Sequence, residues 1–250
     1  MTVERGAWGI IGGTGLTALE GLIIDSETRS ETPFGTPSAP LQRGRFAGRD
    51  VVFLARHGNP HRIPPHQINY RANMQALKDA GVEHVIAVNA VGAINDAMEP
   101  ASLVLPDQVI DYTWGRAQTF FESDSQPPVH VDFTWPYSGV SRDALLQAAR
   151  SDGIGLHEGG VYACTQGPRL ETAAEICRLA GDGCDLVGMT GMPEAVLARE
   201  LGLDYASLAL VVNWAAGRTT SEITMDDIRA NLETGLDRVR ALLCCCLARA

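Results

Sequence analysis

Cationic and hydroxyl side chains follow two apolar, β-forming runs of the sequence. Arg56 and His57 come directly after the run 50–55, and Thr190 follows the short run 186–188. In open α/β sheets, ligands bind beyond the carboxyl ends of strands. An arginine fork beside a histidine donor suits an anion. The sequence therefore predicts an anion site, although an exposed loop pair is the alternative for Arg56 and His57.

Residues 184–214 form the most informative stretch, which we interpret as strand, loop, helix and strand. Pro193 stands where the helix would begin, because proline suits the first helical turn. The run 205–212 is apolar and β-forming, as in a strand buried on both faces, and it ends in Asn213. Met189 and Asn213 are predicted to face a ligand. An ordinary βαβ unit in which Asn213 caps a turn remains the alternative.

Small residues follow two further predicted strands. Residues 12–16 follow the strand 7–11, and residues 89–94 follow the strand 84–88. Glycine and alanine let the backbone approach a ligand, and N–H groups of such loops bind phosphate. A dinucleotide loop is the competing interpretation of 12–16, but it requires a long helix that the sequence does not supply. A tight turn is the alternative for 89–94.

The remaining pattern alternates strands and helices. Strands are expected at 50–55, 103–110 and 159–164, and helices at 69–80, 141–151, 172–179 and 226–248. Residues 30–45 and 60–68 are expected to be loops, and 111–140 a long irregular insertion that covers a site or an interface. With no repeat and no credible linker, residues 1–250 are expected to form one α/β domain.

Composition excludes several classes of function. The formal net charge is −10, which argues against nucleic-acid or anionic-membrane partners. No apolar run approaches the roughly 20 residues of a membrane span. The six cysteines lack Cys-x-x-Cys spacing, so no metal site is expected, and the chain is expected to be cytoplasmic. Cys244, Cys245 and Cys246 are expected to pack the last helix.

Taken together, these segments resemble the trimeric purine nucleoside phosphorylase family, and its methylthioadenosine phosphorylase branch most closely. The resemblance rests on five motifs in order, at 9–15, 54–58, 69–73, 166–169 and 187–190, with Pro193 and Glu194 following. It implies a single α/β domain with a mixed, partly barrel-like sheet between helices. It also implies a homotrimer with sites near the subunit interfaces.

The family reaction is phosphorolysis of the bond between ribose and purine, a pentosyl transfer. A phosphate dianion stabilises the oxocarbenium-like transition state, so no metal or organic cofactor is expected. The partners implied are a small nucleoside and inorganic phosphate. The resemblance assigns phosphate binding to Thr14, Arg56, His57, Asn89, Ala90 and Thr190, and it places Met189 under the ribose.

Two positions bear on the base. The methylthioadenosine branch has Asp where this chain has Asn213, and a small hydroxyl residue where it has Glu171. Both departures resemble the branch that cleaves 6-oxopurines. A carboxylate accepts the N1 hydrogen of hypoxanthine, whereas the N1 of adenine is itself an acceptor. The Asn213 amide can donate to N7 or O6 as the base leaves. Glu171 and Asn213 are therefore the predicted catalytic residues.

The sugar end indicates an apolar 5′ group such as methylthio. The oxopurine branch holds the 5′-hydroxyl with a His near the last helix, and this chain has none there. Met225 and Ile228 lie on one face instead, although ordinary helix packing would explain them as well. His130 matches a residue that the methylthioadenosine branch lends to its neighbour's 5′ pocket. Leu170, which replaces an aromatic residue of the family, and Ala215 complete the predicted substrate-binding set.

The expected substrate is thus a hypoxanthine nucleoside with a 5′-methylthio group. Methylthioadenosine cleavage and inosine or guanosine cleavage are the nearest alternatives. A non-catalytic nucleoside-binding protein and a nucleotide-dependent oxidoreductase are alternatives from other classes.

Overall fold

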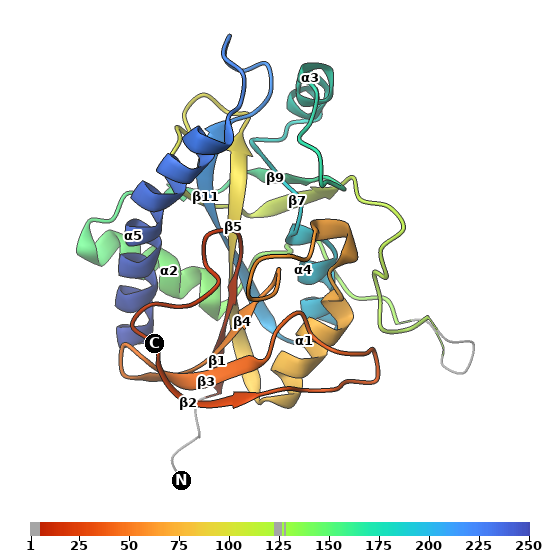
Figure 1. Ribbon diagram of the computed structural model, residues 1–250, viewed down its shortest axis with the longest axis vertical. Coiled ribbons are helices and arrows are strands. Elements are labelled where there is room, and N and C mark those ends of the chain that lie inside the picture. The colour runs from red at the N-terminus through yellow and green to blue at the C-terminus, as the bar shows by residue number, and fades with distance from the viewer. Residues whose placement is uncertain (1–5, 123–126, 128) are drawn as a thin grey trace.

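A long central strand, β5 (Val82–Ala93), joins the two halves of the sheet (Figure 1). Its first half pairs in parallel with β1 (Ala7–Gly12), and its opposite edge pairs in parallel with β11 (Asp204–Trp214). Near its end, β10 (Leu186–Gly188) takes the place of β1 and pairs antiparallel with Gly92 and Ala93. The computed structural model describes residues 6–122, 127 and 129–250.

The other strands extend from these three neighbours of β5. Beyond β1 the order is β4 (Arg49–Ala55), β3 (Leu41–Phe46) and β2 (Ile23–Thr28). Beyond β10 it is β9 (Val161–Cys164) and β7 (Gln108–Asp111). Beyond β11 it is β6 (Leu103–Leu105) and β8 (His157–Glu158). The result is a mixed sheet of eleven strands that branches at β5.

Helices cover both faces of the sheet (Figure 1). On one side, α5 (Met225–Arg249) packs on β11 and on α2 (Val140–Asp152). On the other side, α1 (Tyr70–Asp79) packs against α4 (Gly191–Glu200). A shorter helix, α3 (Ala173–Gly181), follows β9, and a 3-10 turn spans Pro65–Gln67. Separate apolar cores lie on the two faces, which is why residues 205–212 of β11 are buried without interruption.

The α/β class, the mixed sheet and the flanking helices confirm the fold expected from the sequence. The helices expected at 69–80, 141–151, 172–179 and 226–248 are present with small shifts at their ends. Met192 has non-helical φ and ψ, so the regular turns of α4 start at Pro193, as expected. The end of the last helix packs Cys246 into the core and leaves Cys244 exposed.

Two expectations for strands were wrong. Residues 30–45 were expected to be loop, but they contain most of β3, and β2, just before them, was not expected as a strand. The side chains of β2 are exposed on both faces, so this edge strand lacks an apolar alternation. Residues 89–94 were expected to leave the sheet after Val88, whereas β5 continues to Ala93 because β11 pairs with it along that length.

The loop after β1 does not open a helix. Leu16 N–H bonds to Gly13 C=O in a turn, and the next regular element is β2. A dinucleotide-binding unit is thereby excluded, because it requires a helix at that point. Part of the expected insertion, residues 123–126 and 128, lies outside the described residues. Within the described chain, no helix is both long and apolar enough to cross a membrane.

Candidate active site

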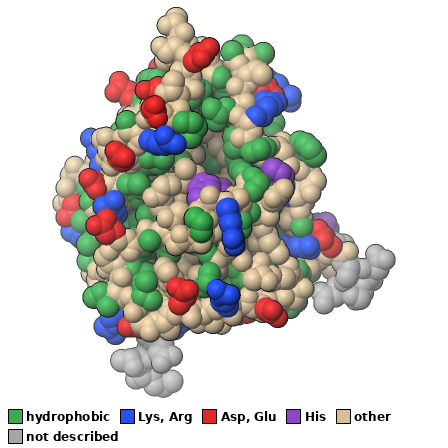
Figure 2. Space-filling model, in the orientation of Figure 1, with side chains coloured by type: hydrophobic (Ala, Val, Ile, Leu, Met, Phe, Trp, Pro, Cys, Tyr) green, Lys and Arg blue, Asp and Glu red, His purple; other side chains and the backbone are tan. Residues whose placement is uncertain are grey.

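A cavity of about 480 Å³ opens beside β5, and histidines surround a hollow at the centre of the face seen in Figure 2. Its volume suits a small organic ligand. The residues that line it come from the ends of β5, β10 and β11, from the loops after β1, β4, β9, β10 and β11, and from the start of α5. Among them are these predicted site residues: Thr14, Arg56, His57, Ala90, Leu170, Glu171, Met189, Thr190, Asn213, Ala215, Met225 and Ile228.

Two predicted site residues do not line this cavity. Asn89 is fully buried behind it. His130 is exposed on the insertion, away from the cavity of its own chain. The role predicted for His130 concerns a neighbouring subunit, so it stays a prediction.

The cavity lies where β5 changes partner. β1 pairs with β5 only as far as Ala87, and β10 begins to pair at Gly92. The intervening edge of β5 has no strand beside it, and Arg56 Nη1 donates to Val88 C=O there at 3.1 Å. Alternate residues of a strand direct their backbone groups to the same side. Ala90, which lines the cavity, therefore presents its backbone to this open edge.

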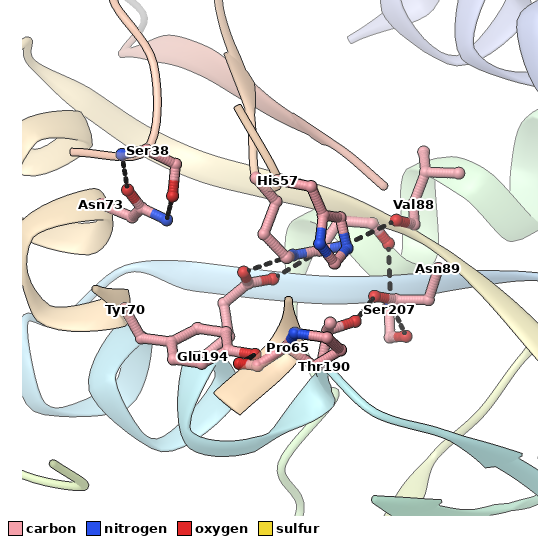
Figure 3. Close-up of polar contacts among 12 residues, drawn as sticks. Ser38, His57, Pro65, Tyr70, Asn73, Val88, Asn89, Thr190, Glu194 and Ser207 are labelled. Atoms are coloured by element: carbon pink, nitrogen blue, oxygen red, sulfur yellow. Dashed lines mark hydrogen bonds and ion pairs between the residues drawn. The ribbon is translucent and has the colours of Figure 1, made fainter. Parts of the chain in front are cut away.

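Arg56 is held by the buried carboxylate of Glu194, which is labelled in Figure 3. Its Nε and Nη2 donate to the two oxygens of Glu194 at 2.7 and 2.8 Å, and neither side chain has any exposed surface. Tyr205 Oη donates to the same carboxylate at 2.8 Å. Burial opposes the Arg56 charge, but Glu194 outweighs it and raises the pKa of Arg56 above its ordinary value. A guanidinium has five N–H groups, and three bonds leave others for a ligand in the cavity.

Gly13 allows the first loop to lie over this ion pair. A Cβ at residue 13 would come within 2.5 Å of Val88 O and 3.1 Å of Arg56 Nη1. Because Val88 O belongs to the backbone of the central strand, it cannot move aside. Only glycine lets the chain that carries Thr14 approach β5 this closely.

His57 differs from the donor expected for it. Its Nδ1 bonds to Ile63 C=O at 2.8 Å, and a carbonyl only accepts, so Nδ1 carries the hydrogen. Burial and the Arg56 charge lower the pKa of His57 from 6.5 to about 4, so the ring is neutral near pH 7. Its Nε2 then accepts a hydrogen bond, for example from the P–OH of a phosphate dianion. His61 stacks on this ring, with the centroids 4.3 Å apart.

Thr190, which precedes α4, is hydrogen-bonded to Asn89 of β5 and through it to Ser207 of β11 (Figure 3). Thr190 Oγ1 donates to Asn89 Oδ1 at 2.9 Å, and Asn89 Nδ2 donates to Ser207 Oγ at 2.8 Å. The Asn89 amide thus bonds inside the sheet and supports Thr190, and the direct phosphate contact expected of Asn89 stays a prediction. Thr190 itself lines the cavity.

A β-bulge orients Asn213. Val211 pairs with Val91 and Asn213 with Gly92, so Val212 is an extra residue in β11. Such bulges redirect side chains next to active sites. Asn213 lies within β11 rather than after it, and its Nδ2 donates to Trp214 C=O at 2.7 Å. The second hydrogen of this amide and its Oδ1 atom take no part in that bond. Because Asn213 lines the cavity, both are available to a ligand there.

Thr165 holds Glu171 in place. Thr165 Oγ1 donates to Glu171 Oε1 at 2.6 Å, which leaves Oε2 to accept from a ligand. The loop between them packs closely on Met189, since a Cβ at Gly167, where φ is +61°, would lie 2.5 Å from Met189 Sδ. The loop that leads to Glu171, the predicted base-binding residue, therefore contacts Met189, the predicted ribose-binding residue.

Another part of the cavity lining is apolar. Ile223, Met225 and Ile228 line it at the start of α5. Ile228 is buried, whereas 59% of Met225 and 43% of Leu170 are exposed. Apolar side chains left exposed around a cavity are typical of a surface that a ligand or a neighbouring chain covers.

Sequence reasoning missed several residues of this site. Glu194 was read as a first-turn carboxylate of a helix, and nothing in the sequence indicates that it pairs with Arg56, 138 positions away. Ser207 was concealed in an apolar strand, and Thr165 is one of several polar residues that follow β9. Among the described residues, no group of three or more His, Cys, Asp or Glu is placed to hold a metal ion.

Comparison with known proteins decides the family. The family model described as the phosphorylase superfamily matches residues 8–248. The chain belongs to the phosphorylase superfamily. A probable S-methyl-5′-thioinosine phosphorylase of Pseudomonas syringae pv. tomato is 57% identical over 94% of this chain and 96% of its own. A probable 6-oxopurine nucleoside phosphorylase of Thermococcus kodakarensis is 44% identical over 94% and 89%.

Among solved structures, the methylthioadenosine phosphorylase of Schistosoma mansoni in complex with adenine matches with a TM-score of 0.93. It is 34% identical, over 98% of this chain and 92% of its own. This phosphorylase is therefore a pentosyltransferase of the purine nucleoside type, which confirms the resemblance read from the motifs.

We predict that Glu194→Gln destabilises the phosphorylase by about 3–5 kcal/mol, because it leaves the buried Arg56 charge without a carboxylate. The free energy of unfolding in urea measures this loss. Glu20→Gln is the matched control, since Glu20 forms an exposed pair with Arg240 at 2.8 Å. It should cost less than about 1 kcal/mol. An equal loss in both variants would contradict the importance of the buried pair.

We also predict a pH dependence that comes from His57. Its pKa in the folded chain, about 4, lies below the ordinary 6.5. Between these values the unfolded chain binds more protons, so stability falls as the pH falls from 6.5 towards 4. Unfolding midpoints for His57→Gln should fall less steeply over this range than those of the wild type. His66→Gln, which changes an exposed histidine, should keep the wild-type slope. If the unfolding midpoint of His57→Gln fell with pH as steeply as that of the wild type, the pH dependence would not come from His57.

Proposed function

We propose that this phosphorylase cleaves S-methyl-5′-thioinosine with inorganic phosphate, giving hypoxanthine and 5-methylthioribose 1-phosphate. The observation that carries the proposal is one cavity that contains both Glu171 with Asn213 and the apolar residues at the start of α5. The names of the relatives agree with it, since the 57% identical protein is a probable S-methyl-5′-thioinosine phosphorylase.

Phosphate binds at the open edge of β5 in this proposal. Thr14, Arg56, His57, Ala90 and Thr190 line that part of the cavity. A phosphate oxygen forms a bond to the anomeric carbon while the bond from that carbon to the purine breaks. The dianion also stabilises the positive charge that develops on the sugar. Arg56 supplies a fixed cation because Glu194 prevents its side chain from moving.

The base end selects hypoxanthine. Glu171, oriented by Thr165, accepts the N1 hydrogen of a 6-oxopurine. Asn213, oriented by the bulge, donates to N7 or O6 as negative charge moves onto the leaving base. Adenine would bring its N1 lone pair against the carboxylate, and such a mismatch costs about 1–3 kcal/mol.

The sugar end selects a 5′-methylthio group. Ile223, Met225 and Ile228 present apolar surface to the cavity, and a thioether avoids the desolvation that a 5′-hydroxyl would suffer there. Met189 lies between this end and the base loop, where the ribose would sit. The reaction needs no metal or organic cofactor, because positioning and charge suffice.

Assembly as a homotrimer would complete the sugar end of the cavity in this proposal. Trp114 and Trp135 of the insertion are 71% and 59% exposed, and His130 lies in the same segment. A neighbouring insertion could thus cover Met225 and Leu170. The six free cysteines suit a reducing cytoplasm, the compartment that we propose.

Comparing three substrates tests the function. We expect the wild type to cleave S-methyl-5′-thioinosine faster than methylthioadenosine and inosine at equal concentration. Glu171→Ser and Asn213→Asp should each narrow the preference for methylthioinosine over methylthioadenosine about 10- to 100-fold, which corresponds to about 1–3 kcal/mol. The ratio of kcat/KM for the two nucleosides is the measurement.

Glu175→Ser is the matched control, because Glu175 caps α3 and pairs with Arg169 outside the cavity. It should keep the wild-type ratio. Faster cleavage of methylthioadenosine by the wild type would overturn the choice of base, and faster cleavage of inosine would overturn the choice of sugar.

Light scattering tests the proposed assembly. We expect a molar mass three times the 26.8 kDa of one chain. Replacement of both Trp114 and Trp135 by Ser should weaken the assembly, since it removes exposed apolar area from the proposed interface. A mass of 26.8 kDa for the wild type would contradict the trimer.

A further inference from the structure

Arg116, which comes from the irregular insertion, contacts both loops that form the nucleoside end of the cavity. Its Nη1 donates to Met189 C=O at 2.9 Å and to Met192 C=O at 2.5 Å. Its Nη2 donates to Gln166 C=O at 2.9 Å and to Thr165 C=O at 3.3 Å. One planar group therefore bonds to four backbone carbonyls from two separate loops.

These loops carry different parts of the proposed site. The loop after β9 contains Thr165 and leads to Glu171, which faces the base. The loop after β10 contains Met189 and Thr190, which face the ribose and the phosphate. No strand pairing joins the two loops beyond the last pair, Gly188 with Cys164. Just past that pair, Thr165 N–H donates to Gly188 C=O at 2.8 Å, and further along Arg116 bonds to both loops.

A third loop is connected through Tyr70. Arg116 Nη1 lies 3.3 Å from Tyr70 Oη, and its Cζ lies 5.5 Å from the centre of the Tyr70 ring. Tyr70 Oη donates in turn to Pro65 C=O at 3.0 Å, and Figure 3 shows Tyr70 directed towards Pro65. Pro65 belongs to the loop 60–68 that covers the cavity on the His57 side.

Only arginine has the geometry for these contacts. Its planar fork presents five N–H groups in fixed directions, whereas lysine carries three donors on one atom. Without the Arg116 guanidinium, the oxygens of these carbonyls would have no hydrogen-bond donor. Each buried oxygen left unpaired costs about 1–3 kcal/mol. Among the described residues, Arg116 forms no ion pair with a carboxylate, so its contacts serve the loops.

We propose that Arg116 is a positioning residue that holds the base-binding Glu171 at a set distance from the ribose- and phosphate-binding Met189 and Thr190. The assignment of these two ends rests on the proposed function. Because displacement of a bound reactant by about 1 Å can lower a rate 100-fold, the constraint acts on catalysis although Arg116 does not line the cavity.

Steady-state kinetics of Arg116→Ala and Arg116→Lys test the proposal. We expect kcat/KM for S-methyl-5′-thioinosine to fall about 100-fold in Arg116→Ala and about 10-fold in Arg116→Lys. The ratio of kcat/KM for methylthioinosine over methylthioadenosine should also narrow, because Glu171 is no longer held. Arg71→Ala is the matched control, since Arg71 binds Glu122 and Thr119 C=O on the same insertion but does not contact the two loops. It should stay within about threefold of the wild type.

Chemical rescue separates positioning from a general loss of structure. Guanidinium chloride, at concentrations that leave the wild type fully active, should restore activity to Arg116→Ala, while sodium chloride of equal ionic strength should not. If Arg116→Ala does not fold, Arg116→Lys and its base ratio decide the question.

Wild-type kinetics in a folded Arg116→Lys, or a folded and inactive Arg116→Ala that guanidinium fails to restore, would overturn the proposal. A wild type that cleaves none of the three nucleosides would instead refute the proposed function.

Discussion

The buried ion pair between Arg56 and Glu194 is the interaction on which the site depends. Arg56 occupies part of the edge of β5 between the last residue paired with β1 and the first paired with β10. A cation there satisfies a strand carbonyl, and in the proposed function it provides a fixed positive charge for phosphate. Taking both charges out of water is costly, and the bidentate geometry with the Tyr205 hydroxyl offsets that cost.

Around this pair, the site is built from loops that follow different strands and are held by polar contacts behind the cavity surface. Asn89 and Ser207 support Thr190, Thr165 supports Glu171, and a bulge directs Asn213. Residues that touch a substrate therefore have fixed partners. Such support keeps catalytic groups close to the productive geometry without reorganisation during the reaction.

The two ends of the cavity differ in how they discriminate. In the proposed function, the base end uses the hydrogen-bonding pair Glu171 and Asn213, which penalises a mispaired polar group strongly. The sugar end in that proposal uses apolar surface, which distinguishes a thioether from a hydroxyl mainly by desolvation. Met225, at the apolar part of the cavity, and Leu170, beside Glu171, are both exposed. The insertion contributes Arg116, which bonds to the loops after β9 and β10. It also exposes Trp114 on the outer surface.

The sequence by itself determined the α/β class, most helices and several of the residues that line the cavity. The class and the helices follow from local signals, such as apolar runs and the Pro193 start, whereas most of the site residues came from the resemblance to a known family. Only the tertiary structure decided that Glu194 neutralises Arg56, that His57 presents an acceptor, and that Asn89 lies behind Thr190. It also continued β5 through residues 89–93. Each of these depends on a partner far along the chain, and propensity and periodicity carry no information about such partners.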